Sequence, residues 1–332
     1  MEKRETNLNP AFYRAGHKED WQGRIDGDGA EHLRWHQVIR TLDLSMETVL
    51  VQPSIVLLGF VCDEGVRRNM GRTGAKDGPQ AIRKALSNLP SHLPSLKLFD
   101  AGDIICLGTS LEEAQQQLGL AISKILTQGG FPLVLGGGHE VTYGHFLGIK
   151  KWGSSNLGII NFDAHFDNRE PGENGNNSGT GFWQIEQDQK KVNSALHYLA
   201  IGIQQTGNTK ALFDRANHTG TIILSAPDFN EKNQGQNTKV LREFLSKIEN
   251  LYLTIDLDVF ASAYAPGVSA PTALGLIPDS YFFIILNLIL QSGKLRSVDF
   301  AELNPTLDQD QRTARLAAAL IDHIVNQLLN EE

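Results

Sequence analysis

The chain contains short apolar runs separated by longer stretches in which apolar and polar residues alternate with a helical period. Apolar runs of four to eight residues bounded by turn residues are typical of buried strands, whereas apolar residues recurring every three or four positions predict helices. The expected strands are 54–60, 96–100, 131–137, 157–162, 195–203, 221–225, 251–255 and 295–300. The expected helices are 32–42, 79–89, 111–128, 141–150, 238–249, 279–291 and 312–330.

Strands and helices alternate along most of the chain. Pro79 suits the first turn of a helix, and Gly129 and Gly130 end another. Strands that alternate with helices of this length predict crossover units and a mostly parallel sheet with both faces covered. Residues 1–50 lack this regularity, so we expect an N-terminal extension packed on one catalytic domain, 51–332.

Composition excludes several classes of partner. The chain has 332 residues, of which 41% are hydrophobic and 20% charged, as in ordinary globular proteins. Its net charge of −8, without a basic run, gives no support for nucleic-acid binding. We expect a small-molecule substrate, no nucleic-acid or membrane partner, and a homo-oligomer whose subunit number the sequence does not indicate.

The cysteines and the apolar segments indicate a cytoplasmic protein. The two cysteines, Cys62 and Cys106, form neither a disulfide framework nor a zinc-ligand spacing, so reduced thiols are expected. The N-terminus lacks the apolar region of a signal peptide. The longest apolar stretch, 281–290, is too short to span a bilayer.

The stretch LGIINFDAHFDNR at 157–169 contains the first candidate chemistry. The apolar strand stops at Phe162, and Asp163, His165 and Asp167 follow. Because alternate residues of an extended chain share a face, these three side chains point the same way. For this triplet alone, a solvated loop with chance polar residues is as good an explanation as a metal site.

Other strands end in the same residue types, and this favours the metal site. Glycines 136–138 precede His139, but no Lys-Ser/Thr follows them, so they do not form a Walker-type phosphate loop. Asp256 and Asp258 lie two apart after a strand, where paired buried carboxylates repel unless a cation neutralises them. The weaker alternative is one capping and one solvated aspartate. Glu302 follows the last strand.

Four carboxylates and two imidazoles carry too much negative charge for one divalent ion and suit two. Oxygen donors with some imidazole and no thiolate favour Mn²⁺ over zinc, with Fe²⁺, Co²⁺ or Ni²⁺ as substitutes. Two ions roughly 3.5–4 Å apart lower the pKa of a shared water, which predicts metal-assisted hydrolysis. The candidate ligands are His139, Asp163, His165, Asp167, Asp256 and Asp258.

The segments GGGHE, NFDAHFD and TIDLDVFASAYAPGVSAPTALGL, in this order, resemble the ureohydrolase family of arginase, agmatinase and formimidoylglutamase. The resemblance covers the chain from Ile55 to the C-terminus. It implies a three-layer α/β/α domain with a mostly parallel, eight-stranded sheet and two Mn²⁺ ions. One ion would be bound by His139, Asp163, Asp167 and Asp256, and the other by Asp163, His165, Asp256 and Asp258.

The resemblance also implies roles in substrate binding and catalysis. Glu302 falls where the family has the carboxylate that pairs with the substrate's guanidinium or amidinium group, and Asp167 is the candidate for relaying a proton to the leaving amine. Three segments are most similar to the formimidoylglutamase subgroup. These are the N-terminal WQGRIDG and RWHQ, the loop and helix at 63–86, and NSGTGFWQI at 177–185.

Two features distinguish the subgroup from arginases and agmatinases. No histidine occurs between His165 and His197, where those enzymes have a proton-transfer histidine. Arg169 stands where they have small polar residues, and an arginine binds a carboxylate bidentately. Arg72 is our candidate for a second carboxylate, with Arg67 and Arg68 as runners-up. A solvated surface charge is an equally good explanation for each of these three loop arginines.

The predicted reaction is therefore hydrolysis of N-formimidoyl-L-glutamate to L-glutamate and formamide, as in histidine degradation. One alternative is another ureohydrolase, namely arginase, agmatinase or a guanidino-acid hydrolase, with the same metals and different specificity loops. A second alternative is a non-catalytic protein on this fold, although such proteins usually lose ligands and all six are present here.

Overall fold

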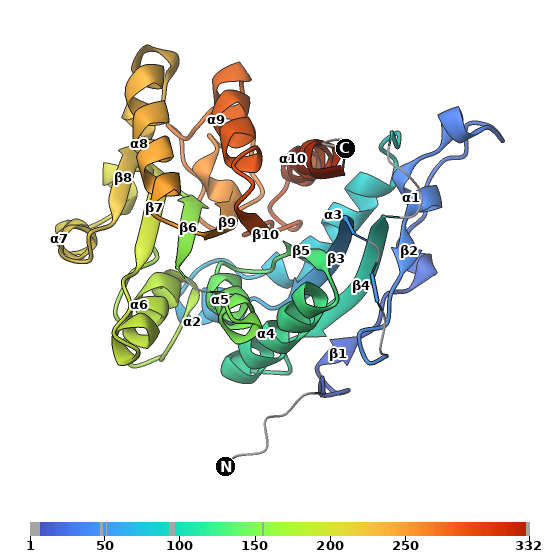
Figure 1. Cartoon of the computed structure of the whole chain (residues 1–332), viewed down its shortest axis with the longest axis horizontal. Coiled ribbons are helices and arrows are strands. Elements are labelled where there is room, and N and C mark those ends of the chain that lie inside the picture. Colours follow the sequence, from blue (N-terminus) through green and yellow to red (C-terminus); the bar gives the residue numbers. More distant parts are fainter. Residues whose placement is uncertain (1–6, 47–48, 51, 93–96, 155, 330–332) are drawn as a thin grey trace.

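The computed structural model describes residues 7–46, 49–50, 52–92, 97–154 and 156–329. Eight parallel strands form the centre of one twisted sheet, in the order β4-β3-β5-β10-β9-β6-β7-β8 (Figure 1). The eight strands predicted from the apolar runs are these eight. Their bounds are β3 Ser54–Val61, β4 Leu98–Ile105, β5 Gly130–Leu135, β6 Leu157–Phe162, β7 His197–Ile203, β8 Ile222–Ser225, β9 Asn250–Asp256 and β10 Leu295–Ala301.

Helices cover both faces of the sheet and give three layers (Figure 1). One face carries α3, α8, α9 and α10, and the other carries α4, α5 and α6. Their bounds are α3 Gly78–Ser87, α4 Leu111–Thr127, α5 Val141–Trp152, α6 Gly181–Lys191, α8 Gln234–Ser246, α9 Ser280–Leu290 and α10 Arg312–Leu329.

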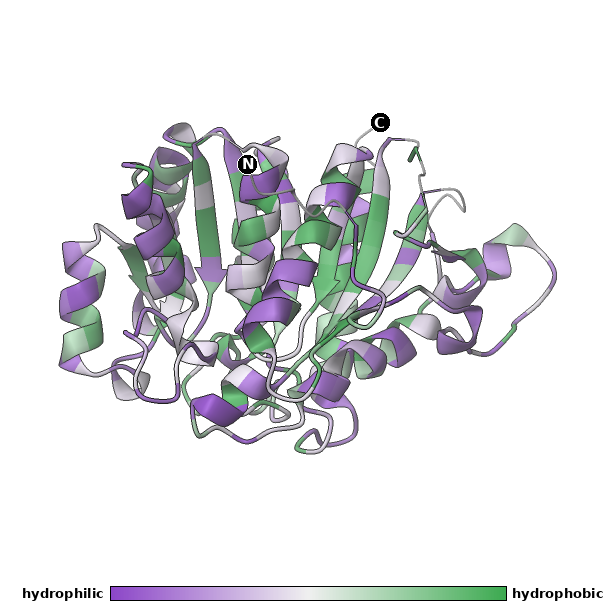
Figure 2. Ribbon diagram, turned by 90° about the horizontal axis from the view of Figure 1, so that it is seen from below, coloured by the Kyte–Doolittle hydropathy of each residue, from purple (hydrophilic) through white to green (hydrophobic). Residues whose placement is uncertain are grey.

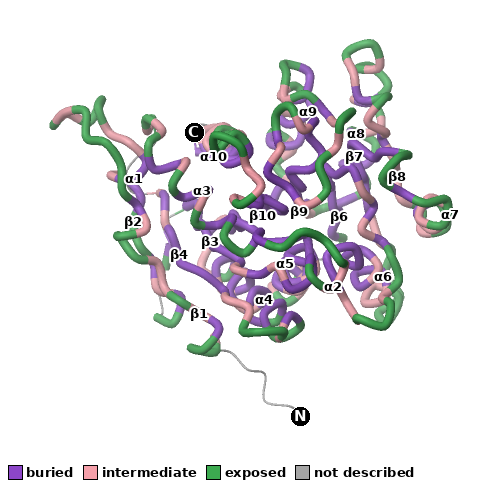
Figure 3. Tube along the Cα trace, turned by 180° about the vertical axis from the view of Figure 1, so that it is seen from behind, coloured by how far each residue is buried: buried purple, intermediate pink, exposed green. Residues whose placement is uncertain are grey.

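The core consists of two apolar clusters, one on each face of the sheet. In β3, Leu57 belongs to one cluster while Val56 and Leu58 belong to the other, because successive side chains of a strand point to opposite faces. Figure 2 shows hydrophobic residues concentrated along the strands, and Figure 3 shows the same strands buried beneath more exposed helices and loops. The continuous apolar runs of the sequence therefore reflect strands that are covered on both sides.

The N-terminal residues extend the sheet beyond β4, which the sequence did not predict. Strand β1 (Tyr13–Arg14) pairs antiparallel with β4, and β2 (Arg40–Thr41) pairs parallel with it, which gives ten strands among the described residues. Strands of two residues have no detectable apolar pattern. The helix expected at 32–42 was wrong in length, because only α1 (Trp35–Val38) is helical and Ile39 is extended.

Three further helices were missed. Helix α2 (Glu64–Arg68) lies in the loop expected at the start of 63–86, α6 begins at Gly181 within the segment NSGTGFWQI, and α7 (Lys210–His218) lies at the β8 edge. All three are short or rich in polar residues, so no clear apolar stripe marks them. Among the described residues, no helix is long and apolar enough to cross a membrane.

Candidate metal centre

The candidate ligands lie at or after the carboxyl ends of three strands, and these three are among four strands that are neighbours in the sheet. Strands β5, β10, β9 and β6 lie side by side, and all are parallel, so their carboxyl ends meet at one edge. His139 follows β5, Asp163 follows β6, and Asp256 is the last residue of β9. The fourth of these strands, β10, is followed by Glu302.

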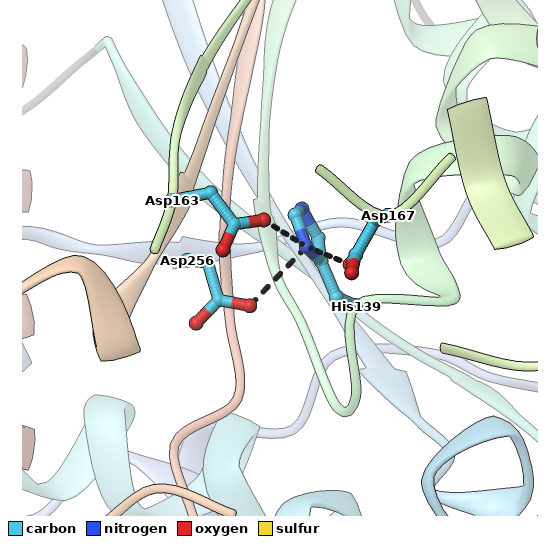
Figure 4. A group of neighbouring side chains, drawn as sticks. All are labelled: His139, Asp163, Asp167 and Asp256. Carbon is cyan, nitrogen blue, oxygen red and sulfur yellow. Dashed lines mark ion pairs between the residues drawn. The ribbon is translucent and has the colours of Figure 1, made fainter. Parts of the chain in front are cut away.

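His139 lies at the centre of the first group (Figure 4). Its Nδ1 atom is 3.1 Å from Oδ2 of Asp163, 2.8 Å from Oδ2 of Asp167 and 3.2 Å from Oδ2 of Asp256. The four side chains come from the carboxyl ends of three strands and the loops that follow them, and they converge on one point (Figure 4). Their potential ligand atoms all lie within 4.8 Å of one another.

A second group shares Asp163 with the first. Nδ1 of His165 is 3.0 Å from Oδ2 of Asp258 and 3.6 Å from Oδ1 of Asp163. The potential ligand atoms of these three residues also lie within 4.8 Å of one another. The structure thus brings all six predicted residues together, as two adjoining groups joined through one carboxylate.

Backbone contacts orient these carboxylates. The backbone N–H of His165 donates to Oδ1 of Asp163 at 2.7 Å, and that of Asp258 donates to Oδ1 of Asp256 at 2.8 Å. Asp167 has a left-handed backbone with φ of 46°, and its carbonyl accepts from the N–H of Phe182 at 3.0 Å. Each pair of alternating residues is therefore a tight turn that fixes one carboxylate oxygen and leaves the other directed at the site.

Without a cation, this arrangement is electrostatically unfavourable. Burial and then repulsion by Asp256 raise the pKa of Asp258 well above its usual value, and burial and repulsion by Asp163 raise that of Asp256. Attraction to Asp258 raises the pKa of His165 to about 12. Burial lowers the pKa of His139, but hydrogen bonds with its carboxylate neighbours raise it overall. The raised pKa values thus favour bound protons on these groups when no cation is present to balance the carboxylates.

The donor set fits divalent cations. Nδ1 of His139 is buried and makes no hydrogen bond of standard geometry, so its lone pair is available to an ion. Neutral imidazole and ionised carboxylate are ligands of Mn²⁺ and related ions, and no cysteine belongs to either group. Two adjoining groups that share Asp163 fit a binuclear metal site.

Glu302 lies beside the ligands without belonging to either group. It has a left-handed backbone with φ of 68°, and its Oε1 accepts the backbone N–H of His139 at 2.9 Å. Burial, followed by repulsion from Asp256 and Glu140, raises its pKa well above the usual value. A cation near its carboxylate would restore the ionised form, as expected for a group that pairs with a positively charged substrate.

A cavity of about 360 Å³ opens above these residues. Carboxylates and His165 form its floor, and loops from distant parts of the sequence form its walls. Both predicted substrate-binding arginines, Arg169 and Arg72, line it. The remaining wall residues include Asn69, Met70, Asn168, Ser178, Asn208 and Ser269.

The arginines differ in how far they are already engaged. Arg169 is exposed and donates from Nη1 to Oδ1 of Asn69 at 3.2 Å. Arg72 donates from Nε to the carbonyl of Ser269 at 2.9 Å and from Nη2 to that of Val268 at 2.8 Å. Arg169 therefore retains more donors for a ligand.

The runners-up do not line the cavity. Arg67 donates twice to Glu64, at 2.6 and 2.7 Å. Arg68 donates to Glu64 at 2.9 Å and to Glu112 at 2.6 Å, and so links α2 to α4. For both residues, a structural ion pair explains the charge, so Arg67 and Arg68 are not supported as substrate ligands.

Sequence analysis missed the neutral polar wall. Asn69 donates to Oγ of Ser178 at 3.1 Å and accepts from Arg169, so it joins two loops that are 109 residues apart. The NSGTG segment was noted for its resemblance to the formimidoylglutamase subgroup and for its lack of histidine, and no structural role was predicted for it. Its Asn177 caps a short 3₁₀ helix, and an Asn that precedes a Ser-Gly-Thr run was a local signal for such a turn.

Met70 occupies a strained position at the cavity wall. It directly follows the C-cap of α2 and has φ of 61°. The backbone N–H of the next residue, Gly71, donates to the carbonyl of Val66 at 2.8 Å. Glycine is the usual residue at this position, and the Met70 side chain is 89% exposed. We expect Met70→Gly to raise the free energy of unfolding by about 1 kcal/mol. Urea denaturation measures this, and Met70→Ala, which keeps the backbone strain, should show no gain.

The sequence matches the model of the arginase family over residues 53–326. The chain belongs to the arginase family. Formimidoylglutamases of this family from Chromobacterium violaceum and Geobacillus thermodenitrificans are 43% and 44% identical to it over 302 and 303 residues. These alignments cover 90% of this chain and 95% and 92% of the relatives.

Solved structures of arginase-family proteins have the same fold. Formiminoglutamase from Trypanosoma cruzi, solved with Mn²⁺, is 28% identical with a TM-score of 0.73, and the match covers 84% of this chain and 95% of that one. Formimidoylglutamase from Bacillus subtilis has a TM-score of 0.76 at 22% identity, over 85% and 89% of the two chains. The predicted three-layer fold with a mostly parallel sheet is confirmed.

Proposed function

We propose that this arginase-family protein hydrolyses N-formimidoyl-L-glutamate to L-glutamate and formamide with two Mn²⁺ ions. The observation that carries the proposal is the charge distribution of the cavity, with carboxylates at the floor and Arg169 and Arg72 on the wall. This substrate has a cationic formimidoyl group at one end and two carboxylates at the other. The relatives named formimidoylglutamase, at 43% and 44% identity, support the same reaction.

The six clustered residues are our proposed metal ligands. One ion would be bound by His139, Asp163, Asp167 and Asp256, and the second by Asp163, His165 and Asp258 with Asp256 as a further shared ligand. When bound, a pair of such ions lowers the pKa of a shared water and supplies hydroxide near neutral pH. The neighbouring backbone N–H groups hold the carboxylates in place before any ion arrives.

Glu302 and Asp167 are our proposed catalytic residues. The Glu302 carboxylate is held by the backbone N–H of His139 and faces the cavity, so it can pair with the formimidoyl cation and orient its carbon. Asp167 lines the same cavity, and its side chain is 15% exposed. It is therefore accessible to the leaving amine and is our candidate for passing a proton to it.

Arg169 and Arg72 are our proposed ligands for the two substrate carboxylates. Asn69 holds one side of the Arg169 guanidinium and leaves its remaining N–H groups free to form a bidentate pair. Arg72 is braced by two backbone carbonyls, so it provides a fixed positive charge rather than a mobile one. An acidic protein thereby gains local attraction for an anionic substrate.

The deciding experiment measures activity on N-formimidoyl-L-glutamate, arginine and agmatine with the Mn²⁺-loaded protein. We expect glutamate and formamide from the first substrate alone. Arg169→Ala should lower kcat/KM by about 30-fold or more, mainly through KM, because the bound substrate would bury this hydrogen-bonded charge pair and breaking such a pair costs at least about 2 kcal/mol. Arg67→Ala, which removes an arginine outside the cavity, is the matched control and should change kcat/KM less than about twofold.

Each outcome of this assay has a distinct meaning. Release of urea from arginine or agmatine would be consistent with the proposed metal centre but would contradict the proposed specificity. Equal losses in Arg169→Ala and Arg67→Ala would remove Arg169 from the binding site. If the Mn²⁺-loaded protein hydrolysed none of the three substrates, this result would contradict the proposed reaction.

Mn²⁺ binding should release protons. In the metal-free protein attraction to Asp258 raises the pKa of His165 to about 12, so this imidazole holds a proton at neutral pH that an ion must displace. Affinity should therefore rise with pH between pH 6 and 8. Calorimetric titrations in buffers of different ionisation enthalpy should give about one proton or more released per ion. Binding heats that do not depend on the buffer would contradict this.

The homo-oligomeric state and the cytoplasmic location stay predictions of the sequence. Light scattering on the purified protein tests the first.

A further inference from the structure

Behind His139, on the side away from the carboxylates, lies a buried chain of hydrogen bonds. The ring Nε2 of His139 is 3.0 Å from Oγ1 of Thr254, and that hydroxyl donates to Oδ1 of Asp299 at 2.6 Å. The side chains of Thr254 and Asp299 are inaccessible to solvent. Neither Thr254 nor Asp299 belongs to the two groups of candidate ligands.

The strands bring these residues together. Thr254 of β9 is the register partner of Asp299 of β10, so the two side chains share a face of the sheet. Tyr252, Thr254 and Asp256 alternate along β9 and therefore also point to one face. One strand thus contributes a candidate metal ligand, the hydroxyl behind His139, and a tyrosine that contacts Asp299.

The donors and acceptors define the protonation of His139. Thr254 has a single hydroxyl proton, and Asp299 accepts it, so the Thr254 oxygen is left to accept from Nε2–H of His139. A neutral imidazole with its proton on Nε2 has its lone pair on Nδ1. Nδ1 is the atom that faces the three carboxylates.

Asp299 is itself fixed from two further sides. The Tyr252 hydroxyl donates to Oδ2 of Asp299, and Nδ1 of His145 lies 2.6 Å from the same oxygen. His145 belongs to α5, which begins two residues after His139. The carboxylate is therefore anchored to a strand and to a helix and cannot turn away from Thr254.

We propose that Thr254, supported by Asp299, is a positioning residue that holds His139 in the tautomer and orientation required for binding a metal ion. Metal-ligating histidines generally donate their second ring N–H to a fixed acceptor, and loss of that acceptor weakens metal affinity about 10–100-fold. Thr254 is the only hydrogen-bond partner of this ring nitrogen among the described residues. The inference rests on the proposed metal centre.

The test compares Mn²⁺ affinity in three variants, measured by competition with a chromogenic chelator. Thr254→Val keeps the shape and removes the hydroxyl, and we expect its affinity for one ion to fall about 10–100-fold. Thr254→Ser keeps the hydroxyl and should stay within about threefold of the unmodified protein. Tyr252→Phe is the matched control, because it removes a donor to Asp299 without touching the contact with His139, and it should also stay within about threefold.

Three results would overturn the proposal. These are unchanged affinity in Thr254→Val, an equal loss in Thr254→Ser, and an equal loss in Tyr252→Phe, which would indicate general damage to the buried network. If Thr254→Val does not fold, Thr254→Ala replaces it with the same expectation. Failure of the unmodified protein to bind Mn²⁺ would instead contradict the proposed metal centre and leave the comparison of variants without a reference value.

Discussion

Replacing Asp163 with asparagine should nearly eliminate Mn²⁺ binding at both proposed positions and lower kcat/KM by about 10³-fold or more. Asp163 is the one residue common to both groups, 3.1 Å from Nδ1 of His139 and 3.6 Å from Nδ1 of His165. An amide keeps the shape and removes the charge that balances two divalent ions. Because bound metal ions contribute several kcal/mol to the transition state, their loss gives an effect of this size.

Metal content after dialysis and steady-state kinetics together measure this effect. Asp214→Asn is the matched control, since it makes the same chemical change at an exposed residue of α7 that pairs with Lys210. It should leave both quantities within about twofold of the unmodified protein. Full Mn²⁺ content and activity in Asp163→Asn would contradict the shared-ligand arrangement.

The sequence predicted the sheet and the ligand cluster for the same physical reason. Most of the strands covered on both faces are continuous apolar runs, so their positions are visible in the sequence. The strand expected at 96–100 was wrong in its end, because β4 continues to Ile105 through Asp100 and Asp103, which interrupt the apolar run. A polar group directly after such a run must lie at the carboxyl edge of a parallel sheet. His139, Asp163 and Asp256 all follow or end a strand in this way, and the structure brings them into contact.

The cavity wall had no comparable signal. Asn69, Ser178 and Arg169 meet through contacts between loops that are up to 109 residues apart, and the residues of each loop are unremarkable by themselves. The strands β1 and β2 were missed because two residues establish no period. Local pattern thus predicts elements with a buried face, while contacts between loops depend on the completed fold.

The three arginines of this segment show both what a local pattern indicates and where it stops. Glu64 precedes Arg67 and Arg68 by three and four residues, a spacing typical of helical ion pairs, and no acidic residue stands at these spacings before Arg72. In the structure, Glu64 pairs with both, while Arg72 lines the cavity and donates to the carbonyls of Val268 and Ser269. The partners of Arg72 lie about 200 positions away, where no local pattern could indicate them, whereas Glu64 is only three and four residues from Arg67 and Arg68.

Glu302→Gln should lower kcat/KM on N-formimidoyl-L-glutamate by about 30-fold to several thousand-fold while leaving Mn²⁺ affinity within about threefold. Removing one partner of a buried, hydrogen-bonded charge pair costs about 2–5 kcal/mol, and here the lost partner is the anion facing the formimidoyl cation. The amide oxygen can still accept the backbone N–H of His139, so the loop that carries this ligand should keep its position.

The variant Glu302→Asp distinguishes the effect of the negative charge from the effect of side-chain length. It retains the anion on a shorter side chain, so it should recover affinity for the cationic group only in part, and its Mn²⁺ content should match that of the unmodified protein. A loss of Mn²⁺ in Glu302→Gln would mean that Glu302 acts through His139, which it contacts at 2.9 Å, rather than on the substrate. An unchanged kcat/KM with full metal content would contradict a role for Glu302 in substrate binding. The negative charge facing the formimidoyl group would then have to come from the aspartates proposed as metal ligands.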